Sequence, residues 1–188
     1  MTAREGARRA FDLKKRGVAV MLPAGILGAI ILVMTGLYGP YRINLTPSEP
    51  LGLWRIVPLG RPAALGDLIF VCPPETADML GARARGYLRS GSCPGGVAPL
   101  IKTVVAVAGQ YVEIGVRVRV EGREVPSSGL AQQDGRGRPL TPFPGGIVPP
   151  GHVFLHSAFR GSYDSRYFGP LPATGILGLA QEVLTHAP

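Results

Sequence analysis

Lys102 and Ser48 are the two residues whose types and surroundings could together perform nucleophilic chemistry. Lys102 is the only lysine beyond residue 16 and lies in the apolar run 99–109, whereas every other basic residue from Gly17 onward is an arginine. Burial disfavours the charged form of a lysine and lowers its pKa, so a buried lysine can act as a base, which arginine cannot. The alternative to a catalytic lysine is an ordinary strand lysine that faces solvent or snorkels to it.

Ser48 is the candidate nucleophile, because it stands between two prolines in the segment Thr46-Pro-Ser-Glu-Pro50. The prolines restrict the backbone and would fix the serine on a rigid turn. A serine hydroxyl also needs a base to accept its proton and hydrogen-bond donors for the oxyanion. Pro-Ser-x-Pro alone is a common turn, so the hypothesis depends on Lys102 and on the segment 160–169.

Four segments, in chain order, resemble the sequence boxes of one peptidase family. Ser48-Glu-Pro50 resembles its nucleophile box, and residues 65–70 (Leu-Gly-Asp-Leu-Ile-Phe) resemble its Gly-Asp strand box. Residues 102–110 resemble the box that begins with the general base, and residues 162–169 match the Ser-x-Asp-Ser-Arg-x-Phe/Trp-Gly box. The chain therefore resembles type I signal peptidases of the Ser/Lys class, most closely the TraF-type peptidases of conjugative plasmid transfer.

The resemblance implies a role for each residue of the site. Ser48 would attack the scissile carbonyl, and neutral Lys102 would accept its proton and deliver it to the leaving amine. Ser162 would orient the lysine amine by a hydrogen bond. The hydroxyl of Thr46 and the backbone N–H of Ser48 would form the oxyanion hole.

The remaining box residues and the departures from the family pattern refine this picture. The resemblance implies that Asp164 and Arg166 form a buried ion pair that shapes the site, with a more direct role for Asp164 left open. Glu49 and Leu51 differ from the usual residues after the nucleophile, and residues 156–159 replace the Gly-Asp-Asn-Arg stretch of housekeeping leader peptidases. These departures favour the TraF branch, as does the pattern Asn44-x-Thr-x-Ser-x-Pro-x-Gly52.

The two cysteines, Cys72 and Cys93, are candidates for a disulfide, because an even count in an oxidising compartment favours pairing. Two free thiols are the alternative. The pair flanks the predicted helical insert, which also fits the TraF branch. His152 and His156 lack a third ligand nearby in sequence, so both are predicted to be ordinary strand or surface histidines. Neither a metal nor a cofactor is expected.

Closely spaced apolar segments predict an all-β domain, mainly antiparallel, and the resemblance makes it a signal-peptidase-like β-fold. One short helical insert is expected over residues 75–89, and a long Gly/Pro/Ser-rich loop over 126–147. Alternation with period two in Val116-Arg-Val-Arg-Val120 predicts a strand with one wet face. The predicted strands cover residues 100–107, 111–114, 116–120, 123–125, 151–156 and 174–184.

The N-terminal part predicts a membrane anchor. Residues 1–17 form a basic tail that holds six basic and two acidic side chains, so half of the formal net charge of +8 lies there. Val18 to Tyr38 is uncharged and long enough to cross a bilayer as a helix. By the positive-inside rule the tail is cytoplasmic and residues 39–188 form a periplasmic catalytic domain. A cleaved signal peptide is the alternative, and the dispersed remaining charge argues against nucleic-acid binding.

These observations predict a serine endopeptidase anchored once in a bacterial inner membrane. The resemblance implies that its partners are the conjugative transfer machinery and a propilin of a type IV secretion system, which it would process or cyclise. Two alternatives remain open at this point. One is a leader peptidase of general secretion, and the other is a non-catalytic scaffold subunit of the transfer channel, in which Ser48 and Lys102 would be bystanders.

Overall fold

The computed structural model describes residues 21, 23, 25–28 and 39–187. The chain divides into two units, Met1–Pro40 and Tyr41–Pro188, and each is considered by itself. The expected tail 1–17 and most of the expected span from Val18 to Tyr38 lie outside the described residues. Within the described residues, no helix is long and apolar enough to cross a membrane.

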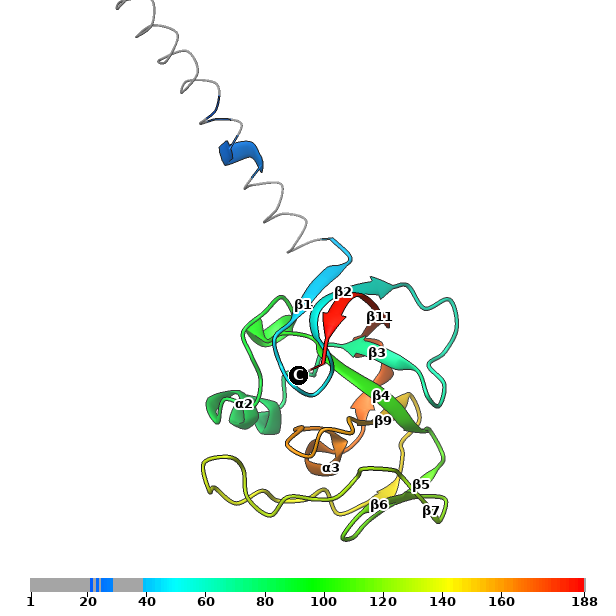
Figure 1. The fold of residues 1–188 in the computed structure, drawn as a ribbon. Helices are drawn as coiled ribbons and strands as arrows, with labels where there is room; N and C mark the ends of the chain where they lie inside the picture. Colours follow the sequence, from blue (N-terminus) through cyan, green and yellow to red (C-terminus); the bar gives the residue numbers. More distant parts are fainter. Residues whose placement is uncertain (1–20, 22, 24, 29–38, 188) are drawn as a thin grey trace, which may run out of the picture. The chain divides into compact units, whose positions relative to one another are not determined.

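The large sheet of the second unit has seven strands in the order β1-β2-β11-β3-β4-β9-β10 (Figure 1). Each neighbouring pair is antiparallel, which confirms the predicted mainly antiparallel β domain. The strands are β1 (Tyr41–Asn44), β2 (Leu51–Val57), β3 (Leu68–Val71), β4 (Leu100–Val107), β9 (His152–His156), β10 (Leu171–Pro172) and β11 (Ile176–His186).

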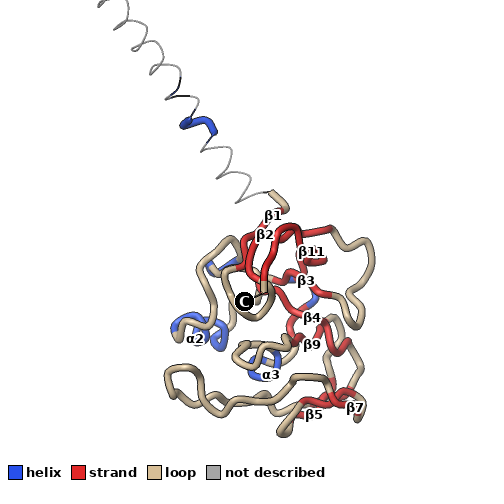
Figure 2. The backbone as a smooth tube through the Cα atoms, in the orientation of Figure 1, coloured by secondary structure: helices blue, strands red, loops and turns tan. Residues whose placement is uncertain are grey.

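A second sheet of four short strands has the order β7-β6-β5-β8. Its strands are β5 (Tyr111–Ile114), β6 (Val118–Val120), β7 (Arg123–Glu124) and β8 (Gly146–Ile147). Val118 and Val120 are buried, as the alternation predicted, but Val116 is 89% exposed because it lies in the turn before β6. The long loop that the sequence predicted follows β7 and is drawn in tan in Figure 2.

Two α-helical segments accompany the sheets. Helix α2 (Ala77–Ala84) begins at Thr76, whose side chain accepts a hydrogen bond from Met79 N, and it is shorter than the predicted 75–89. Gly86, with φ of 82°, ends the helical backbone. The single turn α3 (Ser165–Phe168) was not predicted, and Asp164 caps its N-terminus by accepting from Arg166 N. Short 3-10 turns cover Pro94–Gly96 and Ala173–Gly175.

Strands β1 and β2 were also absent from the prediction, although the loop between them carries Ser48. Their sequence lacks a clear alternation, and β2 is fixed instead by pairing with β1 and β11 on either side. Trp54 of β2 is fully buried, and its Nε1 donates to the Pro50 carbonyl at 2.9 Å. The strand pair therefore holds both ends of the nucleophile turn, residues 45–50.

The strand with Lys102 is central in the large sheet. In the register of the sheet, Lys102 of β4 lies opposite Ile69 of β3, and Thr103 lies opposite His156 of β9. The predicted Gly-Asp turn before β3 is hydrogen-bonded to β4, since Gly66 N donates to the Val104 carbonyl at 2.9 Å. Gly66 has φ of 85°, a conformation that favours glycine. Neighbours on both sides thus fix the position of Lys102.

Cys72 and Cys93 form a disulfide that closes the helical insert. Reduction is expected to destabilise the domain by about 3 kcal/mol on the chain-entropy account, which lowers Tm by about 6–12 °C for a domain of this size. Thermal unfolding with and without a thiol reductant measures the change. A Cys72→Ser/Cys93→Ser variant is the control, because its Tm should not respond to reductant. Equal Tm values for the oxidised and reduced wild type would contradict the prediction.

Candidate active site

The fold brings Ser48 and Lys102 together, although 54 positions separate them in the chain. The Lys102 Nζ lies 3.3 Å from the Ser48 Oγ, which is within hydrogen-bonding distance, and it also donates to the Ile101 carbonyl at 3.0 Å. Lys102 is only 3% exposed, whereas Ser48 is partly exposed. The lysine therefore does not snorkel to solvent, and the serine remains open to a substrate.

The surroundings of Lys102 favour its neutral form. Burial lowers the pKa of Lys102 below its ordinary value, and the positive charge of Arg166 acts in the same direction. The negative charges of Asp164 and Glu49 oppose this effect without reversing it. An amine with a lowered pKa and a hydroxyl within 3.3 Å can act as a general base.

The Asn44 side chain organises the nucleophile turn. Its Nδ2 donates to the carbonyls of Thr46, Glu49 and Pro50 at 2.9, 2.8 and 3.0 Å. Its Oδ1 accepts from the backbone N and the Oγ1 of Thr46 at 3.0 and 2.7 Å. Asn44 is 9% exposed, so these bonds are shielded from water. The side chain of Asn44 therefore fixes the backbone of the turn that presents Ser48.

The Thr46 hydroxyl lies close to the Ser48 hydroxyl. Its Oγ1 is 3.3 Å from the Ser48 Oγ, and in this structure its hydroxyl donates to Asn44 Oδ1. The hydroxyl can turn toward a new acceptor at little cost, because Asn44 Oδ1 keeps the bond from Thr46 N. The predicted role of Thr46 in an oxyanion hole stays a prediction.

Asp164 and Arg166 form a fully buried ion pair, with both side chains 0% exposed. Arg166 Nε and one terminal nitrogen donate to the two carboxylate oxygens of Asp164 at 2.8 and 2.9 Å. Arg166 also donates to the carbonyls of Gly129, Phe159 and Ser162. Burial alone would raise the pKa of Asp164, but the nearby His156 and the hydrogen bonds from Arg166 outweigh it and hold this pKa below its usual value.

Ser157 connects this ion pair with the nucleophile. Its backbone N donates to Asp164 Oδ2 at 3.1 Å, and its Oγ donates to the Ser48 carbonyl at 2.5 Å. The neighbouring His156 is 5% exposed, and its Nδ1 lies 3.4 Å from the same carboxylate oxygen. The segment after β9 thus contacts the nucleophile turn at the Ser48 carbonyl, which Asn44 does not bind.

Ser162 does not make the bond that the sequence predicted for it. Its Oγ is buried and has no hydrogen-bond partner among the described residues. The Lys102 amine instead contacts the Ile101 carbonyl and the Ser48 hydroxyl, so Ser162 does not orient it in this structure. Ser162 contributes through its backbone, where its carbonyl accepts from Arg166 at 3.1 Å.

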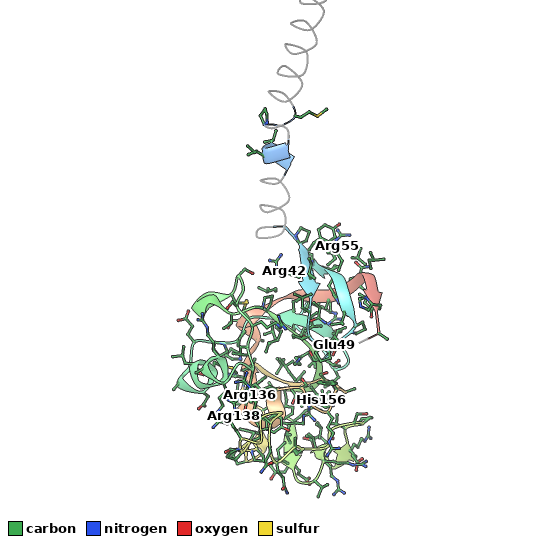
Figure 3. All side chains as sticks on the ribbon, turned by 60° about the vertical axis from the view of Figure 1, so that its left-hand side comes forward. Arg42, Glu49, Arg55, Arg136, Arg138 and His156 are labelled. Atoms are coloured by element: carbon green, nitrogen blue, oxygen red, sulfur yellow. A yellow bond between two sulfur atoms is a disulfide. The ribbon has the colours of Figure 1, made fainter. Side chains whose placement is uncertain are left out.

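Glu49 is a further group of the site, which the sequence indicated only as a departure from the family pattern. Burial raises the pKa of its carboxyl, and contacts with Lys102, Ser157 and His156 partly offset this effect. Figure 3 shows Glu49 and His156 in the same part of the domain. His156 was predicted to be an ordinary strand or surface histidine. Its burial against Asp164 could not be read from the sequence, because it depends on the path of the chain after β9.

A cavity of about 860 Å³ opens elsewhere on the domain. Its lining includes Leu59, Leu65, Val107 and Ile176, and it contains no residue of the nucleophile turn or of the segment 156–166. The chemistry described above is therefore located at the β1–β2 loop and the end of β9, outside this cavity.

Comparison with known proteins places the chain in a family. Residues 15–185 match the family described as signal peptidase, peptidase S26. A probable conjugal transfer protein TraF of Sinorhizobium fredii is 64% identical over 177 residues, which cover 93% of this chain and 94% of that protein. The conjugal transfer protein TraF of Agrobacterium tumefaciens is 54% identical, over 94% of this chain and all of the relative.

More distant proteins match as well. A plasmid transfer protein TraF of Escherichia coli is 35% identical over 84% of this chain and 91% of its own length. A signal peptidase I of Enterococcus faecalis aligns in structure with a TM-score of 0.39 and 16% identity, over 63% of this chain and 97% of that one. From the family match and these relatives, the chain belongs to the peptidase S26 family of signal peptidases and is of the TraF type.

Proposed function

We propose that the chain is a membrane-anchored serine endopeptidase that uses Ser48 as nucleophile and Lys102 as general base. The observation that carries this proposal is the 3.3 Å contact between the Ser48 hydroxyl and the buried Lys102 amine. In the neutral state, the amine donates to the Ile101 carbonyl and keeps its lone pair for the Ser48 proton. Membership of a peptidase family supports the assignment.

The reaction begins when the Ser48 Oγ attacks the scissile carbonyl carbon and Lys102 takes the hydroxyl proton. The Ser48 backbone N–H and the Thr46 hydroxyl, after it turns from Asn44 Oδ1, donate to the oxyanion of the tetrahedral intermediate. The Lys102 ammonium then gives its proton to the leaving amine, and the C–N bond breaks. These steps leave Ser48 joined to the substrate by an ester bond, and Lys102 is neutral again.

The substrate that we propose is the propilin of a conjugative type IV secretion system. The relatives that support this assignment are named as conjugal or plasmid transfer proteins. The localisation that we propose follows the charge pattern, with residues 1–17 cytoplasmic, residues 18–38 spanning the inner membrane and the β-domain periplasmic. An oxidising compartment also suits the bond between Cys72 and Cys93. A leader peptidase of general secretion and a non-catalytic scaffold are the alternatives.

The fate of the ester decides whether the enzyme hydrolyses or cyclises its substrate. Attack by water gives a linear pilin, and attack by the pilin's own N-terminal amine gives a ring. Mass spectrometry of pilin matured with the wild type and with Ser48→Ala tests the proposal. We expect cleavage only with the wild type, and a product one water lighter than the linear form if the ring closes. Equal processing by both proteins would overturn the proposed enzyme.

Glu49 is expected to set the pH range of this reaction. Activity requires neutral Lys102, so kcat/KM should rise with pH through the pKa of this amine. The ionised Glu49 raises this pKa, so Glu49→Gln should move the rising limb of the profile to lower pH. Glu113→Gln, which removes an exposed carboxylate from β5, is the matched control and should leave the limb in place. A shift of the Glu49→Gln limb to higher pH would contradict the electrostatic argument.

A further inference from the structure

We infer that Ser157 is a positioning residue through which the buried Asp164–Arg166 pair holds the nucleophile, an inference that rests on the proposed function of Ser48. The path has two consecutive hydrogen bonds. Asp164 Oδ2 accepts from Ser157 N at 3.1 Å, and the Ser157 Oγ donates to the Ser48 carbonyl at 2.5 Å. Ser157 is 1% exposed, so water does not compete for either bond.

The carboxylate of Asp164 has no free capacity for another role. It accepts from Arg166 N, Nε and a terminal nitrogen as well as from Ser157 N, and His156 Nδ1 lies beside it. The Lys102 amine makes its hydrogen bonds to Ile101 and Ser48. Asp164 is therefore occupied in holding the segment after β9, and its influence on Lys102 is through charge.

Ser157 is the residue that joins this segment to the nucleophile turn. The contact from its Oγ to the Ser48 carbonyl links residues 156–166 with residues 44–50, and Ser157 also lies beside the Glu49 carboxyl, whose pKa it lowers. The hydroxyl is oriented for this purpose, because it accepts from Phe159 N at 3.3 Å and so directs its own proton toward Ser48. The short loop 157–162 is in turn fixed by the bonds from Arg166 to Phe159 and Ser162.

The consequence for catalysis follows from how the nucleophile turn is held. Asn44 binds the carbonyls of Thr46, Glu49 and Pro50, whereas Ser157 binds the carbonyl of Ser48 itself. Without the Ser157 hydroxyl, the peptide unit after Ser48 can rotate and displace the Ser48 Oγ from Lys102. A displacement of about 1 Å at a reacting atom can lower a rate by about 100-fold.

The test uses the full-length protein in detergent, with the propilin of its own transfer system as substrate. Ser157→Ala is expected to lower kcat by about 10- to 100-fold with KM within about twofold. Ser157→Thr, which keeps the hydroxyl, should recover most of the loss. Thr76→Ala is the control, because it removes a hydroxyl that caps helix α2, outside the Asp164–Arg166 network, and should lower Tm while leaving kcat unchanged.

A second readout does not depend on the substrate. Labelling of Ser48 by a fluorophosphonate, with Ser48→Ala as the blank, should be slower in Ser157→Ala by the same factor as kcat and restored in Ser157→Thr. Equal labelling of wild type and Ser157→Ala would overturn the positioning role. If Ser157→Ala is labelled more slowly than the wild type but the wild type does not cleave pilin, the positioning role is supported and the proposed substrate is refuted. The two failures are therefore distinguishable.

Discussion

Lys102→Arg is expected to lower kcat for pilin processing by at least about 1000-fold, as for the loss of a general base. Arginine stays protonated even when it is buried, so the variant places a permanent cation at this position and lacks the lone pair that accepts the Ser48 proton. The 3.3 Å contact between the two side chains makes this proton transfer direct. Processing is measured as the ratio of mature pilin to precursor, alongside the amount of folded enzyme in the membrane.

Lys102→Met tests whether inactivity results from loss of the amine or from a disturbed core around position 102. Methionine is close to lysine in length and suits a site that is 3% exposed, so this variant should fold and remain inactive. Arg55→Met on β2 is the control, because it removes an exposed basic side chain and should process pilin normally. A scaffold would tolerate all three changes. Normal pilin maturation by Lys102→Met would therefore exclude Lys102 as the base.

Local patterns were sufficient for much of the fold. The run that contains Lys102 is strand β4 over the predicted residues 100–107, and the predicted strand 111–114 is β5. The first segment is an apolar run, which favours a buried strand, and the second alternates polar and apolar residues between Gly109 and Gly115, which favours a strand with one wet face. Strands β1 and β2 could not be predicted in the same way. β1 pairs with β2, and the pairing of β2 with β11 depends on residues more than 120 positions away, so no local alternation marks either strand.

The candidate site shows the same division between local and distant information. The sequence indicated Lys102 because it is the only lysine beyond residue 16, and Ser48 because a serine between two prolines occurs together with this lysine and the family boxes. The structure brings the two side chains into contact. The Asp164–Arg166 pair is local in the chain, and it is buried as the family resemblance implied. Ser157 carried no signal, because its role depends on a contact with a residue 109 positions earlier.

Ser162 illustrates how a motif can match while a contact differs. The box from Ser162 to Gly169 fits the family pattern, and its Asp164 and Arg166 form the expected pair. The orientation of a single hydroxyl depends on distances of a few tenths of an ångström, which a sequence match does not determine. In this structure the Lys102 amine, which lies beside Ser48, donates to the Ile101 carbonyl.

Arg166→Ala is expected to destabilise the domain by about 3–5 kcal/mol, because it leaves the Asp164 carboxylate buried without its partner. Arg166 also supports three backbone carbonyls, so its loss frees the loop around Ser162 and the segment at Gly129. Tm should fall by about 6–20 °C for a domain of this size. Urea unfolding at neutral pH measures the free energy directly.

The surface pair of Arg61 and Asp67 provides the matched control for this prediction. Arg61 also donates two hydrogen bonds to a carboxylate, but its side chain is 51% exposed. Solvent screens such a pair, so Arg61→Ala should cost no more than about 1 kcal/mol. A double change, Asp164→Asn with Arg166→Met, should recover part of the stability because no charge stays buried. If Arg166→Ala cost no more than Arg61→Ala, the buried pair would not be what holds the segment after β9, and the path through Ser157 would lose its support.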